Sequence, residues 1–501
     1  MTTPPAQTHA DPAATPPPGC PAHGLGPEGI RRLYGPEAES DPKGLYEKLR
    51  AEHGAVAPVL LHGDLPAWLV LGHRENLDAT RTPSRFSKDS RRWTAFQQGQ
   101  VAADSPLLPV IGWQPLCAFA DGEEHKRLRG AVTDGLQSFD RRGVRRHVAR
   151  FADQLVDSFA ADGSADLVSQ FAEHLPMLVM TQLFGMPEEY GPRLVEAARD
   201  LLKGTETAMA SNEYVVALLS QLVERKRLAP GADLPSWLLQ HAAGLSDHET
   251  MEHLRLILLT ANETTVNLIA DTLRMVLTDR RFRANLSGGH MTLLDALDQV
   301  LWDSPPIAAA PGRWATGDTE LGGQQIREGD MLVLGLAAAN VDPQIRPDLA
   351  DPLYGNRSHL AFSSGPHECP GQDVGRAIAE VGIDMLLARL PDLQLGVEED
   401  QLTWNSSWMS RHLAELPVEF ASRRPKAGPA DTLSTPVPVV AAVQEQQARP
   451  APVGAPAQTA AVSVAAVDVP SVVPAAAASP VESGAPRRGW WGALLARLRG
   501  R

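Results

Sequence analysis

The feature that most constrains this chain is a short cysteine loop at residues 362–371, Phe-Ser-Ser-Gly-Pro-His-Glu-Cys-Pro-Gly, which a helical pattern follows at once. Pro370 suits the first turn of a helix, where a missing N–H is no loss, and Gly371 leaves room for a flat group against the backbone. The free N–H groups and the positive end of the helix dipole point toward Cys369. We therefore expect a thiolate at a helix N-terminus.

The pattern Phe362-x-x-Gly365-x-His367-x-Cys369-x-Gly371 resembles the heme-ligand signature of the cytochrome P450 family of heme-thiolate monooxygenases. The resemblance covers residues 26–424. It implies that Cys369 is the axial ligand of the iron of heme b, and that electron donation from its sulfur favours cleavage of dioxygen. It also places Phe362, His367 and Gly371 among the residues that bind the cofactor.

Two other interpretations of the loop remain open from the residues alone. Cys369 could be an inert buried cysteine near a turn. It could also belong to a zinc site with His359 and His367, although that set lacks a Cys-x-x-Cys pair and a clear fourth ligand.

A second motif lies inside an unusually long helical pattern, which starts with the capping-box sequence Ser246-Asp-His-Glu249 and runs to about Leu277. By resemblance to the family's oxygen-activation motif, Glu263 would relay protons and Thr264 would hydrogen-bond dioxygen. Ala261 stands where the family usually has glycine, which narrows the expected groove slightly. Without the cysteine loop, a capped helix with an interior threonine pair would explain this segment equally well.

The two carboxylates of a heme need cationic partners. His125 and Arg129, four residues apart on one predicted helix face, resemble the family's pair of propionate-binding residues. Arg313 matches another arginine with that role, and His367 matches a further contact. The resemblance therefore implies that these four residues hold the cofactor's carboxylates.

One family element is altered. The family carries Glu-x-x-Arg on a helix before Arg313, and this pair locks to an arginine in the loop before the cysteine, here Arg357. In this chain Gln299 and Trp302 occupy the two positions. A buried arginine without its carboxylate needs another partner. We expect Gln299 to accept a hydrogen bond from Arg357 while Trp302 packs on its guanidinium plane.

The order of patterns predicts a mainly α fold with small β-sheets, in which the heme lies between the long helix and the helix after Cys369. We expect helices at 42–53 and 372–389, a hairpin from strands at 56–61 and 67–71, and a second β region at 313–334 with turns at Gly322-Gly323 and Gly329-Asp330. Residues 1–25 form a flexible leader and 26–424 the monooxygenase domain. The Ala/Pro/Val-rich stretch 425–486 is expected to be disordered, and 487–501 to form a basic amphipathic helix for weak docking to a membrane surface or partner.

Composition limits the cellular context. The net charge of −14 argues against wholesale nucleic-acid binding, and three cysteines in 501 residues indicate a reducing compartment. The most apolar long segment, 254–277, contains four charged residues and is expected to be a buried helix, with no transmembrane anchor. These observations predict a cytoplasmic protein.

The sequence contains no flavin-, nicotinamide- or iron–sulfur-binding pattern. Electrons would therefore come from NAD(P)H through a separate ferredoxin reductase and ferredoxin, the latter docking on the basic cluster at 140–147. The predicted function is insertion of one atom of dioxygen into a small organic substrate. The alternatives are a heme-binding relative with little turnover, which binds a ligand or partners another enzyme, and a peroxide-driven enzyme, which the Glu263–Thr264 pair disfavours.

Overall fold

The computed structural model describes residues 29–425, apart from 204–206, 280–281, 285–287, 352 and 354. The expected monooxygenase domain is therefore described from residue 29 onward. The expected leader at 1–25 and the expected C-terminal helix at 487–501 lie outside the described residues, as does the expected linker beyond residue 425.

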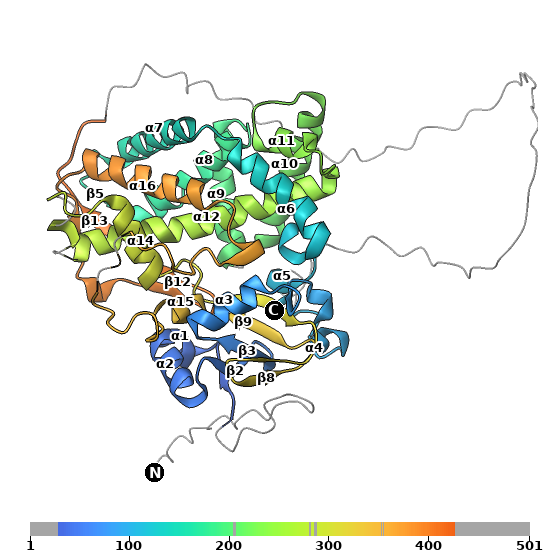
Figure 1. Ribbon diagram of the computed structural model, residues 1–501. Coiled ribbons are helices and arrows are strands. Elements are labelled where there is room, and N and C mark those ends of the chain that lie inside the picture. Colours follow the sequence, from blue (N-terminus) through green and yellow to red (C-terminus); the bar gives the residue numbers. More distant parts are fainter. Residues whose placement is uncertain are drawn as a thin grey trace, which may run out of the picture. The chain divides into compact units, whose positions relative to one another are not determined.

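Helices make up most of the described chain (Figure 1). They are α1 (Pro36–Ser40), α2 (Pro42–His53), α3 (His73–Arg81), α4 (Thr94–Gln97), α5 (Leu108–Ile111), α6 (Gly122–Gln137), α7 (Arg141–Phe159), α8 (Leu175–Leu183), α9 (Gly191–Lys203), α10 (Ala208–Leu228), α11 (Leu234–Gln240), α12 (Asp247–Thr278), α14 (Leu293–Asp303), α15 (Leu336–Asn340) and α16 (Gln372–Arg389). The expected helices at 42–53 and 372–389 are confirmed, as is the long helix α12.

The strands form small sheets, the largest with six strands in the order β1-β2-β3-β9-β6-β4. The strands are β1 (Arg31–Arg32), β2 (Val56–Leu61), β3 (Leu65–Val70), β4 (Phe86–Ser87), β5 (Ser164–Asp166), β6 (Ala310–Ala315), β7 (Thr319–Leu321), β8 (Gln324–Ile326), β9 (Met331–Leu334), β10 (Gln394–Leu395), β11 (Trp404–Ser406), β12 (Arg411–Leu413) and β13 (Pro417–Glu419). The mainly α fold with small sheets is as predicted.

Local turn chemistry explains the β elements. The expected hairpin is present as the antiparallel pair β2–β3, and its turn uses positive φ angles at Gly63 and Asp64. The second β region forms as β6 to β9, with positive φ at Gly322 and Gly323 between β7 and β8. Strand β6 pairs with β9 and with β4, which brings the segment after β4 next to Arg313.

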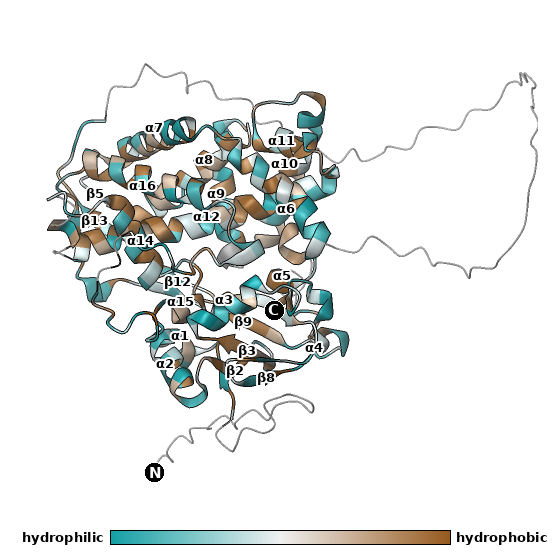
Figure 2. Cartoon of the chain, in the orientation of Figure 1, coloured by the Kyte–Doolittle hydropathy of each residue, from teal (hydrophilic) through white to brown (hydrophobic). Residues whose placement is uncertain are grey.

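The large core is built around α12, which begins with the predicted capping box at Ser246 and Glu249. Apolar residues line the inner faces of α7, α8, α12 and α16, which are gathered above the sheet with β2, β3 and β9 (Figures 1 and 2). A Cβ on Gly375 of α16 would lie 3.6 Å from the Thr265 hydroxyl oxygen of α12, so the two helices approach closely just after the cysteine loop. Among the described helices, none is long and apolar enough to cross a membrane.

Candidate heme-binding site

The cysteine loop is held by backbone hydrogen bonds and by close packing. The Cys369 N–H donates to the Phe362 carbonyl at 2.9 Å, and the Glu368 N–H donates to the Gly365 carbonyl at 3.0 Å. Gly365 has φ 71°, and a Cβ there would lie 2.5 Å from the Thr80 carbonyl oxygen at the end of α3. Only glycine fits both the backbone angle and this contact, so the loop fixes the position of the cysteine.

The partly buried Cys369 thiol lies at the start of α16. Burial raises the pKa of the Cys369 thiol, although the Gly371 N–H and the charge of Arg129 oppose the rise. In the protein without heme, burial therefore outweighs the Gly371 N–H at the helix start, which favours the thiolate. A thiol that coordinates a metal ion is deprotonated by the metal's own charge. A Cβ on Gly371 would lie 4.0 Å from Sγ, so the glycine keeps the space beside the sulfur open.

Four of the predicted cofactor-binding residues gather beside this loop. The rings of His125 on α6 and His367 in the loop have centroids 4.0 Å apart. Arg129, one turn after His125, donates a hydrogen bond to the Glu368 carbonyl. Arg313 on β6 is 2% exposed. Burial of the two histidines is the main cause that lowers their pKa values, and the charge of Arg313 lowers them as well. Residues from three distant parts of the chain are thus brought together.

Several polar atoms in this cluster are buried and lack a hydrogen-bond partner. They are Nε2 of His125 and Nε and Nη1 of Arg313, whereas Nε2 of His367 faces a carboxylate oxygen of Asp121 at 3.5 Å. Burial also lowers the pKa of Arg313 to about 10, because the negative charge of Asp121 offsets only part of the cost of burying the guanidinium. Buried donors without acceptors are costly, and carboxylates supplied by a ligand would satisfy them. The residues present therefore fit a heme, with Cys369 for the iron and this cluster for the two propionates.

The predicted oxygen-activation residues lie near the middle of α12. The Thr264 hydroxyl donates to the Thr260 carbonyl at 2.8 Å, and burial raises the pKa of the Glu263 carboxyl. The next residue, Thr265, is the one beside Gly375 of α16. This places the acid–alcohol pair on the part of α12 that meets the helix following the cysteine loop. Bonding of a threonine hydroxyl to a carbonyl one turn back is a known cause of local helix bending.

The expected role of Gln299 and Trp302 toward Arg357 is wrong. The Gln299 side-chain oxygen accepts from the Leu353 N–H at 3.2 Å, and the Trp302 indole N–H donates to the Asn356 carbonyl at 2.8 Å. Both side chains therefore hold the backbone of the loop before Arg357, and neither contacts its guanidinium. Both hydrogen bonds join neutral groups, so they hold this loop without burying a charge.

The carboxylate that binds Arg357 comes from the residue before Gln299. Asp298 is 1% exposed and forms an ion pair with the buried Arg376 of α16. Its other oxygen lies 3.5 Å from Nε of Arg357, whose side chain is 60% exposed. Arg376 also donates to Nε2 of His359 at 3.1 Å and lies over the Phe362 ring. Asp298 thus joins α14, the loop before the cysteine and α16.

Sequence reasoning also missed a buried contact between α12 and the segment before α6. Nε2 of His253 accepts from the Cys117 N–H at 3.1 Å, while Arg255 donates to the Gln114 side chain at 3.1 Å and pairs with Glu252. His253 and Arg255 are both almost fully buried. The signal in the sequence was a histidine and an arginine inside an apolar helix pattern, where polar groups need partners.

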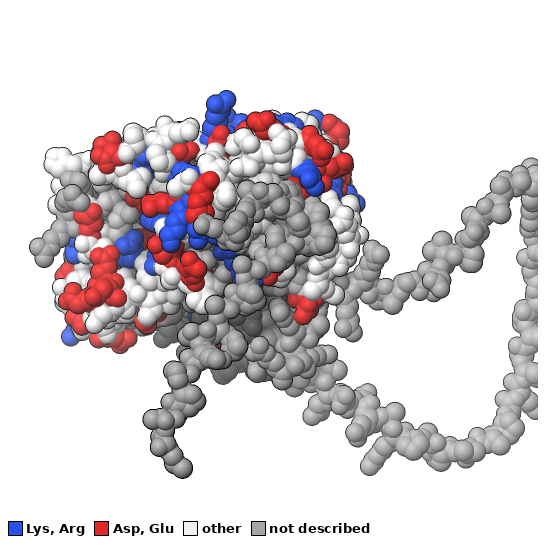
Figure 3. All heavy atoms as spheres, turned by 90° about the horizontal axis from the view of Figure 1, so that it is seen from below, with Lys and Arg blue, Asp and Glu red and all other residues white. Residues whose placement is uncertain are grey.

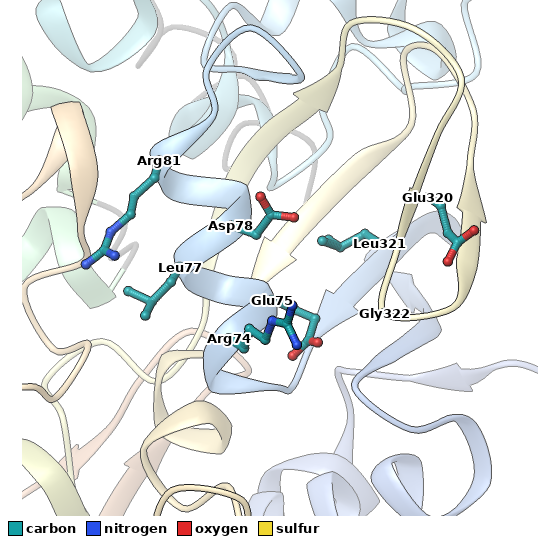
Figure 4. Close-up of a pocket in the computed structure, with 8 residues that line it drawn as sticks. All are labelled: Arg74, Glu75, Leu77, Asp78, Arg81, Glu320, Leu321 and Gly322. Carbon is teal, nitrogen blue, oxygen red and sulfur yellow. The ribbon is translucent and has the colours of Figure 1, made fainter.

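The zinc alternative is not supported in the described part of the chain, where no three His, Cys, Asp or Glu side chains are placed to hold a metal ion. A surface groove lies elsewhere, between α3 and the β7–β8 hairpin (Figure 4). It is lined by charged side chains that include Arg74, Glu75 and Glu320, and it contains none of the predicted site residues. Arg81 at its edge donates to the Ser364 hydroxyl of the cysteine loop at 3.1 Å.

Comparisons with known proteins give the class to which this heme-thiolate architecture belongs. The chain is 32% identical over 400 residues to a 2-hydroxy-5-methyl-1-naphthoate 7-hydroxylase from Streptomyces carzinostaticus, covering 77% of this chain and 96% of that protein. It is 33% identical over 405 residues to the cytochrome P450 monooxygenase PikC from Streptomyces venezuelae, covering 78% and 94%. No protein-family model matches.

Solved structures agree with these relatives. CYP154C4 from Streptomyces sp. W2061 superposes with a TM-score of 0.70 at 28% identity, over 75% of this chain and 95% of that one. CYP154A1 from Streptomyces coelicolor A3(2) gives a TM-score of 0.69 at 28% identity, over 78% and 100%. The chain belongs to the cytochrome P450 family of bacterial enzymes. It is an oxidoreductase that incorporates molecular oxygen, and its cofactor is heme.

Proposed function

We propose that this enzyme hydroxylates a small organic substrate with one atom of dioxygen, using electrons from NAD(P)H delivered by a ferredoxin reductase and a ferredoxin. The observation that carries the proposal is the cysteine loop beside a cluster of unsatisfied cationic groups, with the Glu263–Thr264 pair on the facing helix. The relatives named as hydroxylases support this reaction, and they do not favour a heme-binding protein with little turnover.

The bound heme would supply activation of dioxygen, and the residues of this chain would supply position and protons. Cys369 would hold the iron, and Phe362 and Gly371 would shape the surface around the sulfur. The Glu263 carboxyl, whose pKa is raised by desolvation, would relay protons to the oxygen site. The Thr264 hydroxyl, now bonded to the Thr260 carbonyl, would turn that proton toward the oxygen site.

Docking of the ferredoxin is proposed near the start of α7, where the basic cluster lies. The cluster is less positive than its sequence suggests, because Arg141 pairs with Asp373 at 2.9 Å and Arg145 pairs with Glu380 at 2.7 Å. These pairs are exposed and therefore weak, so the acidic groups of a partner could replace them. On the face shown in Figure 3, acidic and basic side chains are interspersed.

The division of the chain is proposed as the sequence predicts it: a leader at 1–25, the monooxygenase domain at 26–424, a disordered linker at 425–486 and a basic amphipathic segment at 487–501. The terminal segment would dock weakly to a membrane surface or partner through its tryptophans and leucines.

We also propose that the chain is an atypical family member, in which Gln299 and Trp302 replace the usual charged pair and Asp298 supplies the missing carboxylate.

The test of the function is turnover of purified enzyme with ferredoxin, reductase, NADPH, a substrate panel and ¹⁸O₂. We expect a hydroxylated product that carries one labelled oxygen. Thr264→Ala should keep the heme content but divert electrons to hydrogen peroxide, lowering product per NADPH by about tenfold or more, because proton delivery loses its hydroxyl. Product, NADPH and peroxide are measured in the same reaction.

Thr260→Ala is the matched control, since the Thr260 hydroxyl bonds the Leu256 carbonyl one turn earlier on the same helix. It should leave coupling nearly unchanged, and Thr264→Ser should restore most of it. Fully coupled product formation in Thr264→Ala would refute the role of this hydroxyl. Unlabelled product, or no product from any substrate in the wild type, would count against the monooxygenase proposal itself.

A further inference from the structure

A lysine that the family pattern does not include lies beside Arg313. Lys88 follows β4, and since Ser87 is the partner of Trp314 in the β4–β6 pair, Lys88 falls opposite Arg313. A Cβ on Gly312 would lie 3.3 Å from Nζ of Lys88, so the ammonium group sits against the backbone next to Arg313. The Lys88 N–H donates to Asp121 at 2.9 Å, which fixes the start of the side chain.

The charges around Lys88 are poorly balanced in the protein alone. Burial and the neighbouring charge of Arg313 together lower the pKa of Lys88 to about 7, while Asp121 opposes both effects. Asp121 is shared, because it also accepts from the Ser87 hydroxyl at 2.5 Å and faces Nε2 of His367 at 3.5 Å. A buried arginine and a partly buried lysine that share one carboxylate are unfavourable unless a further anion joins them.

The other titratable groups at this place are His125, His367 and Asp121. Burial lowers the pKa of both histidines, which opposes a positive charge on either ring. Although burial opposes ionisation of Asp121, hydrogen bonds led by the one from His367 hold the pKa of Asp121 at about 2. The carboxylate beside Lys88 and Arg313 is therefore that of Asp121.

We propose that Lys88 is a heme-binding residue, whose ammonium group pairs with a heme propionate next to Arg313. Lys88 is a third cation at this place beside Arg129 and Arg313, against the single carboxylate of Asp121. Without Lys88 only the two arginines would face the two propionates, at a place where two donors of Arg313 and Nε2 of His125 have no partner. A charge-assisted hydrogen bond from lysine to carboxylate is among the stronger contacts a protein can offer.

The pairing makes heme affinity depend on pH in a way that is specific to Lys88. Below pH 7 the lysine of the heme-free protein is already protonated, so the propionate gains the full interaction. Above pH 7 the lysine must first take up a proton, and the advantage of lysine over an uncharged residue declines as the pH rises. An arginine at this position stays charged and would show no such decline.

The experiment measures the equilibrium partition of heme between purified holoenzyme and added apomyoglobin between pH 6.5 and pH 9. Lys88→Met should bind heme about tenfold more weakly than wild type at pH 6.5, and this ratio should shrink toward pH 9. Lys88→Arg should stay within about threefold of wild type at the lower pH. Lys126→Met, in which the replaced lysine is exposed on α6 and paired with Glu123, is the matched control and should match wild type.

The Lys88→Met to wild-type ratio and its dependence on pH together distinguish an effect of the Lys88 charge from an effect of side-chain packing. A purely structural role for Lys88 would give a Lys88→Met to wild-type ratio that does not change with pH, with Lys88→Arg as damaging as Lys88→Met. Either that pattern, or a ratio near one at pH 6.5, overturns the proposal. Heme retention is measured without substrate or redox partners, so it is independent of the proposed hydroxylation.

Discussion

Cys369→Ala should abolish the carbon-monoxide difference band of the reduced enzyme at the wavelength that gives the family its name. That band reports sulfur bound to iron, and Cys369 is the cysteine held in the loop at the start of α16. Alanine keeps the backbone bond from position 369 to the Phe362 carbonyl, so the fold should persist while heme content falls sharply. The measurement is the difference spectrum together with the heme content of the purified variant.

Cys117→Ala is the control for this result. Cys117 is also free and buried, but burial raises the pKa of its thiol to about 11, and its N–H is held by His253 on α12. Cys117 lies outside the heme-ligand pattern of residues 362–371, so the band should be unchanged in Cys117→Ala. An unaltered band in Cys369→Ala would refute the assignment of the iron ligand. A histidine-type spectrum in the wild type would refute thiolate ligation altogether.

The features that sequence predicted well are encoded locally. The capping box at Ser246 and Glu249 and the Gly63–Asp64 turn each fix a boundary through neighbouring residues. Pro370, expected in the first turn of the helix, precedes the N-cap Gly371 of α16. The hydrophobic periodicity predicted that the segment of α12 is a helix, and it predicted nearly the full length of that helix. The fold class followed from these elements in order, and the relatives and solved structures agree with it.

The features that sequence predicted poorly depend on contacts between distant segments. Nothing local shows that Asp298 meets Arg376, which lies 78 positions further along the chain by number, or that Lys88 stands opposite Arg313. The resemblance supplied a partner for Arg357 at position 299, whereas the structure uses the adjacent carboxylate. The burial that raises the pKa of the Cys369 thiol also comes from the whole fold, and the loop sequence alone does not show it.

Asp298→Asn should be the most damaging conservative change outside the cysteine loop. Arg376 is 6% exposed, and loss of the carboxylate would leave its guanidinium buried without a counter-ion. Breaking a buried pair by removing one partner costs about 3–5 kcal/mol in unfolding free energy. Because Arg376 also contacts Phe362 and His359, the loop that carries the iron ligand should loosen, and heme content should fall. Denaturant unfolding and the heme-to-protein ratio measure the two effects.

Arg357→Met is the matched comparison, because it removes the exposed partner of the same carboxylate. Because the arginine of this 3.5 Å pair is exposed, the pair contributes about 0–1 kcal/mol, and the variant should keep nearly all of its stability and heme.

If Arg376 is the true partner, Arg376→Met combined with Asp298→Asn should be less harmful than the sum of the two single changes, since the double variant contains no unpaired buried charge. Strict additivity, or equal damage from Arg357→Met, would show that the ion pair between α14 and α16 does not stabilise the heme-binding loop. The altered motif would then need a different compensation, and the backbone contacts of Gln299 and Trp302 with Leu353 and Asn356 would have to hold the loop alone.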